Sequence, residues 1–266
     1  MHSVDTHAHL DFPQFEDDRA SLIKELAKLD IGVINIATTV ESNEKVAELA
    51  AKNDYLWAAV GVHPTEITPD LLTELPKLTD NLKKLISNNP KIVAIGEVGL
   101  DYHRPEGKAS ADSQKVVLRQ FLTFALEQNL PVIFHCRDAY GDLITMLADY
   151  PDLRGVIHCF TGSAEEAKRF LGLGLLISFT ATITYAANDH QRQAAAVVPL
   201  ERILLETDSP FLVPESRRGQ RNDPKTILEV AATIAEAKKI SAEEVLARTT
   251  LNAIALFGLK NRKEHE

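Results

Sequence analysis

The sequence lacks the features of membrane proteins, of disulfide-rich secreted proteins and of proteins that coat duplex DNA. No apolar run approaches the roughly 20 residues of a membrane span, and no basic-then-apolar signal peptide opens the chain. Two cysteines in 266 residues do not make a disulfide scaffold. The net charge of −9 argues against a broad basic face, although it does not exclude an enzyme that grips nucleic acid locally through metals. We therefore expect a cytoplasmic protein without membrane association.

The chain also lacks internal repeats, low-complexity segments and a linker rich in Pro, Gly or Ser, so we expect residues 1–266 to form a single domain. Hydrophobic residues make up 45% of the chain and charged residues 25%, which leaves ample material for a large core. The charged end "LKNRKEHE" after Phe257 predicts a short frayed tail with His265 on its surface.

Eight apolar segments have the length and composition of β-strands. They cover residues 3–7, 31–38, 56–62, 92–98, 131–136, 155–159, 175–180 and 203–208. Most are apolar along their whole length, which indicates strands buried on both faces, as in parallel sheets. Helix-length segments lie between them, among them 14–29 and 111–128, with apolar residues near helical spacing. Strand alternating with helix eight times predicts an α/β fold of the (β/α)8 TIM-barrel class.

A doubly wound open sheet is the structural alternative. Such a sheet usually carries a glycine-rich phosphate-binding turn after its first strand. Here the first strand runs into "HAHLDF", so the barrel is favoured. A parallel barrel builds its active site where its strands end. At that point five segments carry metal-binding residue types, namely His7 with His9, Glu97, His135, His158 and Asp208. Imidazoles combined with carboxylates suit Zn²⁺, Mn²⁺ or Mg²⁺.

The spacing of the first three of these residues is informative. His7 and His9 are two residues apart on a strand, share a face and can reach one ion. Glu97 ends an apolar run, where a carboxylate is costly unless it is paired, protonated or bound to a cation. An internal ion pair is one explanation. A bridge between two metal ions is the more natural role for Glu97.

The last strand carries two acidic residues that should also share a face. We expect Asp208, nearer the strand end, to be a metal ligand and the acceptor of a proton. We expect Glu206, one layer deeper, to support a ligand by a hydrogen bond. Asp101 either supports the site in the same way or belongs to a turn. Cys136 and Cys159 each follow a histidine, so strand geometry predicts that both face the helices as packing residues.

Several other residues are candidates for contact with substrate. His63, followed by Pro64, is predicted to bind a substrate phosphate or water, with a capped core histidine as the alternative. Arg104 lies beside His103 in an exposed loop. The loop after the last strand contains Arg217, Arg218 and Arg221. Arginine suits bidentate phosphate binding, although a charge run is often only solvated surface.

Seven ordered blocks of the sequence resemble the TatD-type metal-dependent deoxyribonucleases of the amidohydrolase-like superfamily. They are "DTHAHLD", "GVHP", "IGEVGLDY", "HCRD", "HCFTGS", "ETDSPFL" and "RGQRNDP". The resemblance implies a distorted TIM barrel with two divalent metal ions, Mg²⁺, Mn²⁺ or Zn²⁺. One ion would take His7, His9, Glu97 and Asp208, and the other Glu97, His135 and His158. His103, where many members carry an aromatic residue, and Ala181, where glycine is common, are the local departures.

The resemblance also implies a nuclease that acts on DNA, often from the 3′ end, and that is linked to DNA repair or to turnover of DNA fragments. With the acidic charge, this predicts DNA ends or single-stranded DNA as the substrate and no obligate protein partner. Asp208 and Glu97 would be the catalytic residues. One alternative is a metal-dependent hydrolase of a small amide, lactone or phosphoester. The other is a degenerate barrel that only binds ligands, which the complete ligand set argues against.

Overall fold

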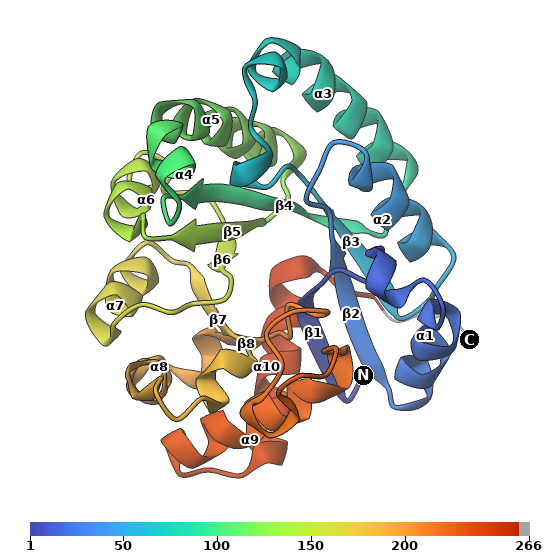
Figure 1. The fold of residues 1–266 in the computed structure, drawn as a ribbon, viewed down its shortest axis with the longest axis vertical. Helices are drawn as coiled ribbons and strands as arrows, with labels where there is room; N and C mark the ends of the chain where they lie inside the picture. The colour runs from blue at the N-terminus through green and yellow to red at the C-terminus, as the bar shows by residue number, and fades with distance from the viewer. Residues whose placement is uncertain (261–266) are drawn as a thin grey trace.

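Eight parallel strands form one sheet whose order follows the chain, and the helices lie outside the ring of strands (Figure 1). The computed structural model describes residues 1–260. Its strands are β1 (Ser3–Ala8), β2 (Ile31–Ile36), β3 (Leu56–Val60), β4 (Ile92–Asp101), β5 (Val132–Arg137), β6 (Gly155–Ile157), β7 (Leu176–Phe179) and β8 (Ile203–Leu205). Its α-helices are α1 (Arg19–Lys28), α2 (Ser42–Ala51), α3 (Pro69–Asn88), α4 (Pro105–Ala109), α5 (Ala111–Gln128), α6 (Tyr140–Leu147), α7 (Ala164–Gly172), α8 (Asp189–Val197), α9 (Ile227–Lys238) and α10 (Ala242–Phe257). The predicted TIM-barrel-like fold is confirmed.

Some element boundaries differ from those predicted. β6 ends at Ile157 and β8 at Leu205, and shortly beyond them Cys159 and Asp208 adopt positive φ angles of 45° and 56°, which lie outside the strand region. The helix predicted over 14–29 begins only at Arg19, since a 3-10 helix and turns precede it. The helix predicted over 111–128 is observed with those bounds.

The barrel closes irregularly between its first and last strands. β1 and the chain beyond β8 meet at one isolated parallel bridge between Ala8 and Ser209. Nearer the start of β1, a side chain of this strand accepts hydrogen bonds from the chain beyond β8, as a backbone carbonyl would in a regular sheet. The buried carboxylate of Asp5 accepts hydrogen bonds from the backbone N–H of Thr207 and from its hydroxyl. This side-chain closure accounts for the distortion that the sequence comparison with barrel hydrolases predicts.

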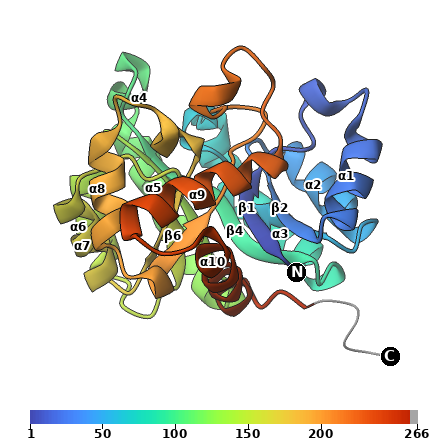
Figure 2. The same cartoon turned by 90° about the horizontal axis from the view of Figure 1, so that it is seen from below.

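The barrel interior is a continuous apolar core that is sealed at one end. Strand residues such as Ile34, Ile133 and Val156 join one buried cluster with Leu256 and Phe257 of α10. Figure 2 shows α10 lying across the end of the barrel where the N-terminus lies, with the long loop between β8 and α9 at the opposite end. The interior is therefore plugged at the N-terminal ends of the strands and accessible only from their C-terminal ends.

A second, larger apolar cluster fills the layer between strands and helices. Phe121 of α5, Ile234 of α9 and Phe134 of β5 are among its fully buried members. No helix within residues 1–260 has the length and hydrophobicity needed to cross a membrane. Leu259 packs into the interior core, so the tail is not frayed at that residue. His265 and the rest of 261–266 lie outside the described residues.

Gly99 gives a test of how closely β4 and β5 must pack. A methyl group at Gly99 would collide with the carbonyl oxygen of His135, its register partner on β5. We expect Gly99→Ala to lower the free energy of unfolding by about 3 kcal/mol, since neither backbone can retreat. Gly141→Ala in α6 is the matched control, because nothing lies within 4 Å of the added methyl group. Urea unfolding followed by circular dichroism measures both, and a Gly99→Ala protein as stable as the control would contradict this packing.

Candidate metal centre

Strand alternation brings the predicted residues on β5 and β6 to the open end of the barrel. Ile133 and Val156 belong to the interior core. His135 and His158 stand two residues further along the chain and so point to the same side, into a cavity above that core. In a parallel barrel, the next inward-facing side chain on a strand beyond the apolar core lies at the C-terminal end of the barrel. These two positions follow directly from the period of a strand.

The residues on β1 and β4 reach the cavity only because the register changes. Val4 and Ala94 belong to the interior core, so strict alternation would turn His7 and Glu97 toward the helices. The pairing of β1 with β2 shifts between Asp5 and Ala8, and that of β4 with β5 shifts in the segment 95–98. Each irregularity reverses the phase of alternation and returns the functional side chain to the interior.

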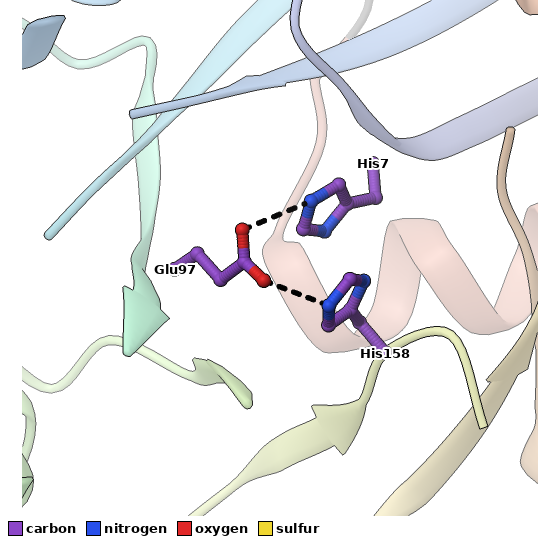
Figure 3. Close-up of side chains that lie close together, drawn as sticks. All are labelled: His7, Glu97 and His158. Carbon is purple, nitrogen blue, oxygen red and sulfur yellow. Dashed lines mark ion pairs between the residues drawn. The ribbon is translucent and has the colours of Figure 1, made fainter. Parts of the chain in front are cut away.

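Glu97 stands at the centre of the cluster with its two oxygens facing different histidines (Figure 3). Its Oε1 lies 2.7 Å from His135 Nδ1 and 2.8 Å from His158 Nε2. Its Oε2 lies 3.4 Å from His7 Nε2. The side chain is only 3% exposed. A carboxylate whose two oxygens contact different histidines can contribute one oxygen to each of two groups of metal ligands.

The second ligand group lies around Asp208. His9 Nε2 is 3.3 Å from Asp208 Oδ1 and 3.3 Å from His7 Nε2. His7 Nε2 is 3.6 Å from the same Asp208 oxygen. Asp208 follows β8 in the left-handed backbone region, and its N–H donates to the carbonyl of His7 at 2.8 Å. The carboxylate is thus tied to the strand that carries the two histidines, while 17% of it remains exposed to the cavity.

The far sides of three imidazole rings are held by fixed acceptors. His9 Nδ1 lies 3.0 Å from the carbonyl oxygen of Ile36. His135 Nε2 lies 3.2 Å from Asp101 Oδ2. His158 Nδ1 lies 3.3 Å from Glu206 Oε1, and Glu206 also accepts hydrogen bonds from Cys159 N–H and the Ser178 hydroxyl. Acceptors in these places orient a ring and direct its other nitrogen toward an ion. Asp101 and Glu206 lie behind the rings of His135 and His158, and their supporting role stays a prediction.

The electrostatics of the cluster favour ionised carboxylates. Burial opposes the charge on Glu97, but the neighbouring imidazoles, His158 first, hold its pKa well below the usual range. Burial also opposes the charged form of His9, yet the hydrogen bond to Asp208 and the charges of Asp208 and Glu97 together outweigh it and raise the pKa of His9 to about 9. Within residues 1–260 the charge partners of Glu97 and Asp208 are imidazoles rather than lysine or arginine.

These observations fit a site for divalent cations. Three sets of ligand atoms each lie within 4.8 Å of one another, namely His7 with Glu97 and His158, His7 with His9 and Asp208, and His63 with Glu97 and His135. Ring nitrogens that approach to 3.2–3.3 Å can share a single N–H proton, and a bound cation would replace that proton. The residues present suit Zn²⁺, Mn²⁺ or Mg²⁺.

His63 contacts the cluster but presents a proton to it. Its Nδ1 accepts a hydrogen bond from the backbone N–H of Thr65 at 3.2 Å, so the proton of the neutral ring belongs on Nε2. Nε2 lies 3.2 Å from His135 Nδ1 and 3.6 Å from Glu97 Oε1. Burial lowers the pKa of His63 to about 3, which keeps the ring neutral. The ring therefore offers a hydrogen-bond donor to the cavity, as a contact to substrate requires.

A cavity of about 520 Å³ opens above the cluster, lined by His9, Glu97, His135, His158 and Asp208 among others. Among the lining residues to which we assigned no function from the sequence are Phe12, Arg137 and Phe211. Arg137 continues the inward series of Ile133 and His135 on β5, so strand alternation was the signal that could have identified it. Nothing in the sequence indicates that Phe12 and Phe211 would meet.

The three arginines of the loop after β8, Arg217, Arg218 and Arg221, do not lie around this cavity. Arg217 pairs with Glu229 of α9 at 2.7 Å, and Arg218 pairs with Glu215 at 2.8 Å. Arg221 donates to both carboxylate oxygens of Asp18, at 2.8 and 2.6 Å, and covers the ring of Phe15. None of these three arginines lines the cavity. They tie the loop to neighbouring elements.

Two further expectations concern the loop at Arg104 and the cysteines. Arg104 is exposed at the start of α4 and does not line the cavity, and His103 beside it pairs with Asp138 at 2.8 Å. Cys136 packs in the helix-facing core, as predicted. Cys159 does not, because its positive φ turns the thiol toward the cavity, 3.6 Å from the Thr180 hydroxyl.

Comparisons with known proteins agree with this geometry. The family described as TatD related DNase matches residues 4–258. The metal-dependent hydrolase YabD of Bacillus subtilis is 36% identical over 95% of this chain and 98% of its own. The 3′-5′ ssDNA/RNA exonuclease TatD of Erwinia amylovora is 33% identical over 96% and 99%. The crystal structure of YjjV, a TatD homologue from Escherichia coli, superposes with a TM-score of 0.86 at 32% identity, over 97% and 99% of the two chains.

Metal binding should depend on Glu97. Mn²⁺ at about 100 times its Kd stabilises a binding protein by about 2.7 kcal/mol, so chelator-treated wild type should gain thermal stability when Mn²⁺ is added. Glu97→Gln should lose most of this gain because it removes the carboxylate shared by both ligand groups. Glu48→Gln on α2, at a side chain 70% exposed, is the matched control. Scanning fluorimetry with metal analysis provides the readout, and full metal content in Glu97→Gln would refute the assignment.

Proposed function

The chain belongs to the TatD-related DNase family of metal-dependent hydrolases, and we propose that it is a deoxyribonuclease that shortens single-stranded DNA from its 3′ end. A relative of similar length, identical at 33% of positions, carries the name of a 3′-5′ exonuclease on single-stranded DNA and RNA. The observation that carries the proposal is the set of three ligand groups at the base of an open cavity, two of which include Glu97. DNA repair, or turnover of DNA fragments, would be the setting for such an activity.

Six side chains would bind the metal ions, and one of them, Asp208, would also act in phosphodiester cleavage. We propose that His7, His9, Glu97, His135, His158 and Asp208 hold two divalent ions, with Glu97 common to both. When bound, such ions lower the pKa of water and neutralise charge on phosphate oxygens. Asp208 is ionised, because the hydrogen bond from His9 and the neighbouring imidazoles together outweigh burial and lower its pKa, and it lines the cavity. Asp208 would orient the attacking water and accept its proton.

Two groups are placed to position the phosphodiester. The Nε2–H of His63 would donate to a non-bridging oxygen of the phosphate. Arg137 is the one lysine or arginine among the described residues that line the cavity, and its exposed guanidinium could pair with a phosphate. Arg104, Arg217, Arg218 and Arg221 lie outside the cavity lining, so we propose that they contact only the more distant part of a bound strand.

A single strand or a strand end suits this site better than a duplex. The net charge of −9 repels a polyanion over most of the surface, so attraction must come from the metal centre and a few cationic groups. A cavity of about 520 Å³ admits a chain end rather than a paired helix. The second candidate is a small-molecule phosphoester, lactone or amide, which the cavity volume also suits and which the pairing of Arg217 and Arg221 with carboxylates favours.

The direct test of the nuclease is turnover of single-stranded oligonucleotides labelled at the 3′ or the 5′ end, with Mg²⁺ or Mn²⁺. We expect early loss of the 3′ label and a ladder of shortened 5′-labelled products. Chelator should abolish both signals, and Glu97→Ala should abolish both even with metal present. Intact oligonucleotides after incubation with metal-loaded wild type would move the assignment to a small-molecule ester or amide.

Replacing Arg137 tests whether its guanidinium contacts a phosphate of the substrate. If Arg137 pairs with a phosphate, Arg137→Ala should lower kcat/KM on the oligonucleotide by roughly 10- to 100-fold, equivalent to the loss of one hydrogen bond to a charged group. Arg248→Ala, at an exposed position on α10 at the plugged end of the barrel, is the matched control and should be neutral. Undiminished turnover of the oligonucleotide by Arg137→Ala would exclude this contact.

A further inference from the structure

Two phenylalanines escape burial, and they lie next to each other at the cavity. The chain has ten phenylalanines, and eight of them are buried. The other two are Phe12, which is half-buried, and Phe211, which is 44% exposed. Phe211 is the one exposed aromatic side chain within residues 1–260. Full burial of a large aromatic side chain stabilises a protein by about 1.5–3 kcal/mol, and an exposed ring loses part of this stabilisation. The position of Phe211 beside a polar site therefore suggests a ligand that covers the ring.

The two rings form one wall of the cavity beside the metal centre. Their centroids are 5.8 Å apart and their planes meet at 83°. The centroid of Phe12 lies 4.9 Å from that of His9, and the centroid of Phe211 lies 6.3 Å from it. Leu212 lines the same cavity. A flat group attached to an atom held at the metal centre would therefore meet an aromatic surface.

Both rings are carried by turns that are fixed by side-chain donors, the half-buried Arg19 and the buried Asn222. The guanidinium of Arg19 donates to the carbonyl oxygens of Leu10, Asp11 and Phe12, which locks the turn after β1. The amide of Asn222, which is fully buried, donates to the carbonyl oxygens of Thr207 and Phe211, at 3.0 and 2.7 Å. The rings are thus pre-positioned, and a ligand would pay little ordering entropy to use them.

We propose that Phe211, with Phe12 as its side wall, is a stacking subsite for the nucleobase next to the scissile phosphate. The inference rests on the proposed nuclease function and specifies how that site would hold a strand end. Phenylalanine offers a π-face and no hydrogen-bonding group, so it would bind all four bases without reading their edges. Seating one base here would place its phosphate over the metal centre and would favour an unpaired end, because a paired base has no free face.

The test compares two single-stranded oligonucleotides that differ only at the last two 3′ positions. One carries ordinary nucleotides there and the other carries base-free tetrahydrofuran residues. Stacking on an aromatic side chain contributes about 1–3 kcal/mol per base, so Phe211→Ala should lower kcat/KM on the ordinary substrate by about 5- to 150-fold. On the base-free substrate wild type and variant should be equally slow. Phe211→Trp should match or exceed wild type, and Phe211→Leu should resemble Phe211→Ala.

Controls separate stacking from structural damage. Leu251→Ala removes a side chain of α10 that is 57% exposed and remote from the cavity, so it should change neither substrate's kcat/KM. An equal loss by Phe211→Ala on both substrates, or full activity of Phe211→Leu, would overturn the stacking role. Unchanged turnover by Phe211→Ala would overturn the subsite alone. A wild-type protein that cleaves neither substrate would overturn the proposed nuclease, and the subsite with it.

Discussion

The buried carboxylate of Glu97 is the constraint on which the site depends. A carboxylate only 3% exposed is tolerated where cationic groups or hydrogen-bond donors surround it. The barrel supplies imidazoles for this purpose, carried by three different strands or their ends, at His7, His135 and His158. The carboxylates of Asp101 and Glu206 lie behind two of these rings, those of His135 and His158. The placement of the histidines therefore follows from the need to compensate the buried charge of Glu97.

These side chains can meet at one site because the barrel is plugged at its other end. α10 closes the interior below, so each inward side chain beyond the apolar core must enter the same cavity above. Two strands meet this requirement only by departing from regular pairing. The shifts in β1 and β4 interrupt regular pairing and bring His7, His9 and Glu97 into the ligand cluster. Irregular pairing in this barrel is thus part of the site.

The distribution of charge and of aromatic surface narrows the kind of substrate that the proposed function would use. An acidic surface and arginines already paired with carboxylates leave few groups to attract a polyanion. Metal ions, His63 and Arg137 would provide that attraction locally, and the Phe12–Phe211 wall would add an apolar contact. A strand end with unpaired bases presents both a phosphate and a free base face, whereas a duplex hides the second.

The sequence alone determined the barrel class, the ligand types and which pairs share a face, because these follow from local periodicity. His135 and His158 could be placed from the two-residue repeat of a strand. Other features were decided by the tertiary structure. They include the reversed phase of His7 and Glu97, the cavity-facing thiol of Cys159, and the meeting of Phe12 with Phe211. Arg221 reaches Asp18 across 203 residues of sequence, and no local pattern encodes a contact that forms only when distant segments pack together.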